Sequence, residues 1–408
     1  MIGTGAFTSL GFQLKDLNNP SVVLTLWVLG GILALSGAFS YAEVGTVISK
    51  SGGEYAFLSK IYNPLIGYLS GWISLTVGFA APIAFSEYFP FGNFNVKWMS
   101  IALVAVITLI HTRSLKLSAE FQNISTLLKV ILIVIIISIG LVLPEHSDNE
   151  IVSSKEYFTE LTSTAFAIAL IYVSYSYSGW NAAAYITEEF ENPLKSLPKA
   201  LIGGTVLVTV LYTLLQYVFL KHVPVNDLAG QLNVGTIATK QMLGEKAGSF
   251  FGLAISLLLI SGISAMVWVG PRVTLSIAKE HRLWSYFQTQ ENGIPKRALW
   301  LQFGISALLL LTGTFEQIMI YCGILLTASS LMTVLGVFKL RKQNQNQQIK
   351  GFKSPLFPLF QIVFILLSVW MITYAFINNP FETILGMSNL LIGTGTYFWS
   401  KKLEKSNY

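Results

Sequence analysis

The chain has 408 residues, of which 53% are hydrophobic and only 11% charged, and its formal net charge is +6. Soluble domains carry about 25% charged residues, and a soluble protein of this size could not bury so much apolar surface. The composition therefore excludes an ordinary soluble protein. The basic residues are dispersed over loops, which argues against a nucleic-acid-binding protein.

The chain opens with the segment MIGTGAFTSLG, which is apolar and rich in glycine and hydroxyl residues. A helix from residue 1 to about residue 14 would be roughly 20 Å long, short of the ~30 Å hydrocarbon core of a bilayer. The segment lacks the basic region and cleavage site of a signal peptide. Two interpretations remain: an interfacial piece, or the remainder of a first helix that begins upstream of an internal methionine.

Eleven further apolar segments are predicted to cross a bilayer. They lie at about 22–40, 65–86, 97–112, 125–143, 162–187, 200–220, 250–270, 298–313, 317–338, 357–377 and 383–399. Pro271 predicts the end of the segment at 250–270, because proline lacks a backbone donor. If the loops alternate between the two sides, most of the 26 Lys and Arg residues fall on one side. The positive-inside rule makes that side cytoplasmic and places the C-terminus there.

Two of these segments contain residues that interrupt a helix. The first is the opening segment, and the second is SYSYSGWN at 174–181, in the middle of a span. Free backbone groups at this depth are tolerated only where they line a cavity. The two segments begin two five-helix sets, and paired interruptions of this kind indicate a transporter's binding site. The alternative is that the glycines merely allow close helix packing.

The interruptions also predict a ligand class. Amide groups at the N-terminus of a half-helix attract an anion such as a carboxylate. Unpaired carbonyls at the C-terminus of a half-helix attract a cation such as an ammonium group. An α-amino acid zwitterion carries both charges, so the sequence predicts an amino acid as the ligand.

Four motifs resemble the amino acid–polyamine–organocation (APC) superfamily. They are IGTGAF (2–7), YAEVG with SGGEYAFL (41–58), YSGWNAAAYITEEFENPLKSLPKA (177–200) and GPRVTLSIAKE (270–280). The chain is similar over its whole length to L-type and bacterial amino acid permeases. This resemblance implies a single all-α polytopic membrane domain with a LeuT-type five-plus-five inverted repeat and alternating access.

The resemblance also implies how the domain is divided. The first repeat is 1–143, lacking half of its first helix, and the second is 162–338; two helices at 357–399 and a cytoplasmic tail at 400–408 follow. Relatives carry a complete half-helix before the glycine motif. The alternatives to a transporter are therefore a non-transporting amino acid sensor or an inactive fragment on the same fold.

The resemblance further implies a set of substrate-binding residues. Gly3, Thr4 and Gly5 would supply amides to the substrate carboxylate, and Tyr175 would close over the substrate. Ser176, Tyr177 and Ser178 would line the unwound stretch whose carbonyls take the amino group. Trp180 and Asn181 lie just beyond.

Lys129 is the one Lys or Arg that lies away from the ends of a predicted span. If it faces the bundle interior it is a functional candidate, and in relatives a lysine at the matching place reaches toward the first helix. A cation there would explain ion-independent exchange, or proton coupling if the amine releases its proton. The alternative is a side chain that extends to the cytoplasmic headgroups.

Other polar residues have less specific assignments. Ser261 and Ser264 could hydrogen-bond to the pocket or across helices. Glu43, Glu54, Arg272 and the glutamates at 188, 189 and 191 are predicted to form gate or structural ion pairs. Because the spans carry no Asp or Glu at mid-depth, a neutral amino acid is the predicted substrate.

The remaining residues do not indicate an enzyme. The 4 histidines are scattered, with no metal-ligand spacing or nucleophile motif, so no metal or cofactor is predicted. Some relatives attach to a glycoprotein through a cysteine, but the loop at 86–98 contains none, and Cys322 lies in a span. We therefore expect no disulfide-linked heavy chain and a prokaryotic plasma (inner) membrane. The expected partners are the amino acid, the lipid bilayer and, as a coupling ion, protons.

Overall fold

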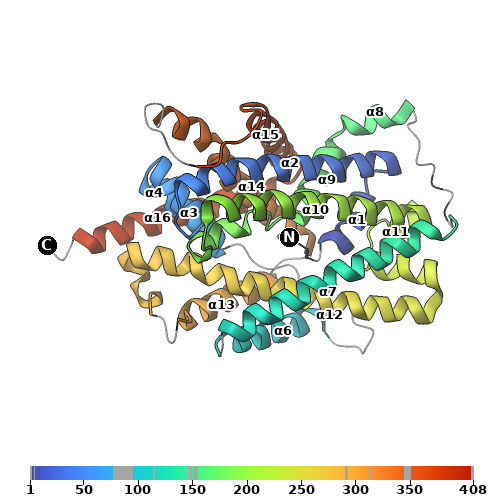
Figure 1. The fold of residues 1–408 in the computed structure, drawn as a ribbon, viewed down its shortest axis with the longest axis horizontal. Helices are drawn as coiled ribbons and strands as arrows, with labels where there is room; N and C mark the ends of the chain where they lie inside the picture. The colour runs from blue at the N-terminus through green and yellow to red at the C-terminus, as the bar shows by residue number, and fades with distance from the viewer. Residues whose placement is uncertain are drawn as a thin grey trace.

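The computed structural model describes residues 2–3, 5–76, 95–113, 115–145, 147, 149, 155–289, 293–312, 315–343 and 351–405. Every element in this part of the chain is a helix. Four long helices run along the long axis of the molecule (Figure 1). They are α2 (Pro20–Val47), α7 (Leu115–Val142), α10 (Pro193–His222) and α12 (Val234–Glu280), the last of which is broken at Gly244. In the described residues, 6 helices are long and apolar enough to cross a membrane. The predicted class, an all-α polytopic membrane protein, is confirmed.

Each predicted span corresponds to a helix, to within a few residues at its ends, over its described residues, except that a turn at 177–181 divides the span at 162–187. The other spans correspond to α4 (Pro64–Thr76), α6 (Val96–His111), α9 (Thr164–Ser176), α13 (Lys296–Thr312), α14 (Phe315–Gln343), α15 (Leu359–Asn378) and α16 (Pro380–Lys405). Several helices extend beyond the apolar segment that predicts them. The sequence thus locates the spans but underestimates their length.

Short helices lie at the two ends of the molecule. Figure 1 shows α3 (Glu54–Ile61) and the C-terminal end of α16 at one end, which we call the α3 end. Figure 1 also shows α8 (Lys155–Leu161) and α11 (Val225–Leu228) at the opposite end, which we call the α8 end. This arrangement is the one that the predicted alternation of loops requires.

Local sequence signals explain where several helices begin. Asn19 precedes Pro20, and its side chain accepts a hydrogen bond from the Ser21 amide at 2.9 Å. Ser163 likewise caps α9 by accepting from the Phe166 amide at 3.2 Å. These side chains satisfy amides that have no intrahelical acceptor.

The helix α12 departs from the sequence prediction. It passes through Pro271 and ends at Glu280, so the predicted end at Pro271 is wrong. Proline is tolerated inside membrane helices when neighbouring groups satisfy the freed backbone. In the next position of the helix, the Arg272 guanidinium donates to the carbonyl of Trp268 at 2.9 Å.

The opening segment forms α1 (Gly5–Gln13), and all nine of its residues are buried in the core. Gln216 of α10 donates to the carbonyl of Ala6 at 2.8 Å. Trp27 of α2 donates to the side-chain oxygen of Gln13 at 2.9 Å. The interfacial interpretation of this segment is therefore wrong, because helices enclose it and satisfy its polar groups.

Candidate functional site

The helices α1 and α9 cross in close contact at Gly5 and Ser176. A methyl group on Gly5 would lie 2.6 Å from the Cα atom of Ser176, so any larger side chain would push the two backbones apart. The hydroxyls of Ser9 and Ser176 are 2.9 Å apart, and Ser9 also donates to the Gly5 carbonyl at 2.7 Å. The two segments that the sequence pairs therefore meet directly.

Both segments are interrupted at this crossing. Residues 2 and 3 are not helical, and α1 begins at Gly5. On the other side, α9 ends at Ser176, a turn occupies 177–181, and the 3-10 helix η1 (Ala182–Glu189) follows. Gly179 has φ of 90°, a conformation that favours glycine. The predicted interruption is present, although the residues from 174 to 176 remain helical.

The interruption leaves backbone groups free for a ligand. In the part of the chain that the structure describes, no backbone N–H donates to the carbonyls of Ser176, Tyr177 and Ser178. The amides of the first turn of α1 have no intrahelical acceptor, because a helix satisfies its amides only from the second turn onward. Opposite partial charges therefore face the same region from two chain segments.

A cavity of about 280 Å³ lies at this crossing, large enough for an amino acid. It contains most of the residues that the sequence predicts for the site. They are Gly3, Gly5, Lys129, Tyr175, Ser176, Tyr177, Ser178, Trp180 and Asn181. Thr4, the remaining predicted substrate ligand, lies outside the described residues. Among the described lining residues, Lys129 is the one charged side chain and none is acidic.

Several of these residues also have partners away from the cavity. The Tyr177 hydroxyl donates to the Trp27 carbonyl of α2 at 3.0 Å. The Trp180 ring packs edge-on against Tyr41, with ring centroids 4.7 Å apart. Tyr177 and Trp180 thus anchor the turn to α2 through their side chains.

Lys129 of α7 faces the interior of the bundle. Its side chain is 4% exposed, and Nζ donates to the carbonyl of Ile2 at 2.6 Å. Gly262 of α12 lies on the other side, where a methyl group would be 3.7 Å from the Lys129 amine. This geometry favours the interior orientation over extension to the headgroups.

Ser261 and Ser264 do not line the cavity. The Ser261 hydroxyl donates to the Leu258 carbonyl of its own helix at 3.1 Å. Ser264 forms a hydrogen bond with His111 of α6 at 2.8 Å. Of the two predicted uses, bonding across helices is the one that Ser264 shows.

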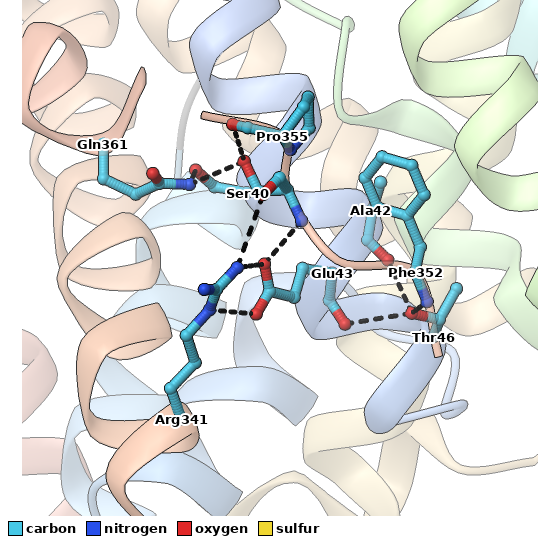
Figure 2. A network of polar contacts seen from close by, with 9 residues as sticks. Ser40, Ala42, Glu43, Thr46, Arg341, Phe352, Pro355 and Gln361 are labelled. Carbon is cyan, nitrogen blue, oxygen red and sulfur yellow. Dashed lines mark hydrogen bonds and ion pairs between the residues drawn. The ribbon is translucent and has the colours of Figure 1, made fainter. Parts of the chain in front are cut away.

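The carboxylates near the α3 end differ in their partners. Glu43 forms a two-pronged ion pair with Arg341 of α14, at 2.6 and 2.8 Å, and also accepts from the Ser354 amide at 2.8 Å. Figure 2 shows this network joining α2 and α14 to the segment that leads into α15. Arg341 is not among the predicted ion-pair residues, because the basic run around it gives no sign that one member pairs with a buried acid.

Of the other residues predicted to form ion pairs, Arg272 and Glu189 pair with each other, whereas Glu54 does not form an ion pair in the part of the chain that the structure describes. Arg272 pairs with Glu189 of η1 at 2.8 Å, as predicted for these residue types. Glu54 has no basic side chain within ion-pair distance in the described residues; instead its Oε1 accepts from Tyr41 and Asn181. The predicted ion pair of Glu54 is therefore wrong.

The helix α3 is also tied to the end of α12. The Tyr55 hydroxyl donates to the carboxylate of Glu280 at 2.7 Å. Burial, together with this hydrogen bond, raises the pKa of Tyr55 above its usual range. The hydroxyl therefore stays protonated and keeps its role as a donor.

Comparison with known proteins gives a consistent family. A family model described as amino acid permease matches residues 1–398. The chain is 26% identical over 422 residues to the serine/threonine exchanger SteT of Bacillus subtilis (strain 168), with 100% of this chain and 94% of that protein covered. These matches extend over nearly the whole of both proteins.

Two human relatives show comparable similarity. The b(0,+)-type amino acid transporter 1 is 27% identical over 430 residues, covering 99% of this chain and 87% of the relative. The cystine/glutamate transporter is 26% identical over 428 residues, covering 98% and 83%. These relatives are transporters rather than enzymes. The family match over residues 1–398, together with the two interrupted helices around one cavity, shows that the chain belongs to the amino acid permease family of the APC superfamily.

Proposed function

We propose that the chain is a secondary active transporter of neutral amino acids that works by alternating access. The observation that carries the proposal is the crossing of α1 and α9. There the first turn of α1, whose amides have no intrahelical acceptor, and the free carbonyls at 176–178 of the other helix lie at the same cavity. Paired interrupted helices at a central site are typical of transporters with a five-plus-five inverted repeat. In this proposal the repeats are 1–143 and 162–338.

The amino acid would bind with its two charged groups on opposite helix ends. Its carboxylate would accept hydrogen bonds from the amides around Gly3 and Gly5, where the helix dipole favours an anion. Its ammonium group would donate to the carbonyls at 176–178. Tyr175 would close over the bound substrate.

The cavity lining supports a substrate with a neutral side chain. A cationic side chain would meet no carboxylate among the described lining residues, while Lys129 already contributes a positive charge. The Bacillus relative is named as a serine/threonine exchanger. Small neutral amino acids are therefore the first substrates to test.

Lys129 is the proposed coupling residue. Its amine holds the Ile2 carbonyl just before α1, so loss or gain of its proton would change the position of the site's first segment. Proton symport and exchange are both compatible with this geometry. Lys129→Ala is expected to abolish the pH dependence of uptake, and uptake that varies with pH as in the wild type would contradict the coupling role.

The location and orientation of the protein complete the proposal. The chain would lie in a plasma membrane, with the α3 end and the C-terminus on the cytoplasmic side. The basic loops at the α3 end support this orientation.

The test is counterflow in proteoliposomes made with the purified chain. Vesicles loaded with unlabelled L-serine should accumulate labelled L-serine, and L-lysine and L-glutamate should compete poorly. Binding of L-serine without counterflow would indicate a sensor, and absence of both would reject the proposal. Competition by L-lysine as strong as that by L-alanine would reject the neutral substrate class.

A further inference from the structure

The turn at 51–54, within the motif SGGEYAFL, lies against the interrupted part of the sixth span. Three hydrogen bonds join them. The Gly52 amide donates to the Tyr185 carbonyl at 3.1 Å, and the Glu188 amide donates to Ser51 Oγ at 3.0 Å. The Asn181 side-chain amide donates to Glu54 Oε1 at 2.6 Å. Contacts made by the turn at 51–54 therefore hold both η1 and the turn at 177–181 in place.

Glycines allow this close approach. Gly52 and Gly53 have φ of 113° and 57°, which other residues rarely adopt. A methyl group on Gly53 would lie 2.6 Å from the Tyr185 ring. The pair of glycines in the motif is explained by contact with η1, a use that the substrate site does not require.

Glu54 is the buried centre of this contact. Its side chain is 1% exposed, and Oε1 also accepts from the Tyr41 hydroxyl of α2 at 2.7 Å. Oε2 is buried without a hydrogen-bond partner in the described part of the chain. A buried carboxylate without a cation is costly, so Glu54 depends on the neutral donors that surround it.

The role follows from where Asn181 lies. Asn181 and Tyr185 both line the cavity, and Asn181 closes the turn that presents the free carbonyls at 176–178. Trp180, which is also in this turn, packs against Tyr41, the second donor to Glu54. One carboxylate thus holds the turn from two directions.

We propose that Glu54 is a positioning residue for the substrate site, which holds Asn181 and thereby fixes the carbonyls that receive the substrate's ammonium group. The inference rests on the proposed amino acid transport. A binding group that is ordered before the ligand arrives loses less entropy on binding. Removing the acceptor should therefore weaken substrate affinity rather than slow the transport step.

The test compares Glu54→Met with Glu54→Gln by serine counterflow. Methionine keeps the volume but accepts no comparable hydrogen bond, so we expect KM to rise about tenfold, as for loss of a hydrogen bond to a carboxylate. Glutamine keeps an oxygen for Asn181 and Tyr41, so its KM should stay within about twofold of the wild type. The maximal rate per folded protein should stay within about twofold in both variants.

Ser51→Ala provides a second variant that should fold, because it removes only one acceptor at the edge of the turn. We expect its KM to rise about two- to threefold. Glu160→Ala is the matched control, since this carboxylate accepts from the Asn19 amide at the α8 end and does not line the cavity. Its KM should equal that of the wild type.

The outcomes separate the inference from the function on which it depends. A wild-type chain that shows neither binding nor counterflow would reject transport itself. If the wild type transports and folded Glu54→Met keeps its KM, the positioning role is overturned. If Glu54→Met does not fold, an unchanged KM in Ser51→Ala, or a tenfold higher KM in Glu54→Gln, would overturn it instead.

Discussion

Two buried carboxylates near the α3 end have opposite surroundings. Glu43 on α2 is 5% exposed and is matched by the Arg341 guanidinium and the Ser354 amide. Glu54 at the start of α3 is even more buried, yet its donors are the neutral groups of Tyr41 and Asn181. The Glu43 network joins α2 and α14 to the segment that leads into α15 (Figure 2), whereas the Glu54 contacts reach residues that line the cavity.

This difference shows that burial alone does not define what an acidic residue does. A carboxylate with a cation and an amide as partners contributes to stability, because removing either partner strands the other. A carboxylate held by neutral donors loses no ion pair when its charge is removed. We therefore expect changes at Glu43 to affect stability and changes at Glu54 to affect affinity.

The largest expected effect on stability is that of Arg341→Ala. This variant leaves Glu43 buried without its cation, which should lower the free energy of unfolding by about 3 kcal/mol. The midpoint of thermal unfolding in detergent measures the loss. Lys342→Ala, an exposed neighbour on the same helix, is the control and should unfold like the wild type. If Arg341→Ala and Lys342→Ala unfold at the same temperature, the ion pair of Glu43 does not contribute to stability, and Glu43 no longer differs from Glu54 in this respect.

An intermediate effect is expected from the same substitution at the two carboxylates. Glu43→Gln removes the charge that Arg341 faces and should cost about 2 kcal/mol. Glu54→Gln removes no ion pair and should stay within about 1 kcal/mol of the wild type. Thermal unfolding of both variants under one condition gives the comparison. A larger loss at Glu54 than at Glu43 would show that the two environments have been assigned the wrong way round.

The smallest effect is expected at the partly exposed pair of Arg272 and Glu189. Their side chains are 22% and 47% exposed, and ion pairs of this kind contribute little. Glu189→Gln should therefore shift the free energy of unfolding by about 0.5 kcal/mol or less. Glu188→Gln is the control, because the described residues include no ion pair of Glu188. If Glu189→Gln lowers the free energy of unfolding as much as Arg341→Ala does, the exposure of an ion pair does not determine its contribution to stability.

Much of the architecture could be predicted from the sequence, because it depends on local properties. Runs of about 20 apolar residues locate the membrane helices, and each predicted span corresponds to a helix where the structure describes it, apart from the turn in the sixth span. The small and polar residues of SYSYSGWN likewise predict the break in the sixth span. The site residues that line one cavity followed from the resemblance of IGTGAF and the sixth-span motif to a known family.

The sequence alone determined where helices form and break, because these features depend on neighbouring residues in the chain. Only the tertiary structure decided that Lys129 faces Ile2, that Glu43 pairs with Arg341 and that Glu54 holds Asn181. The extension of α12 through Pro271 was decided in the same way, because tertiary packing tolerates a proline that the local sequence reads as a helix end. Each of these features depends on which groups meet after packing, and a hydropathy pattern contains no information about those partners.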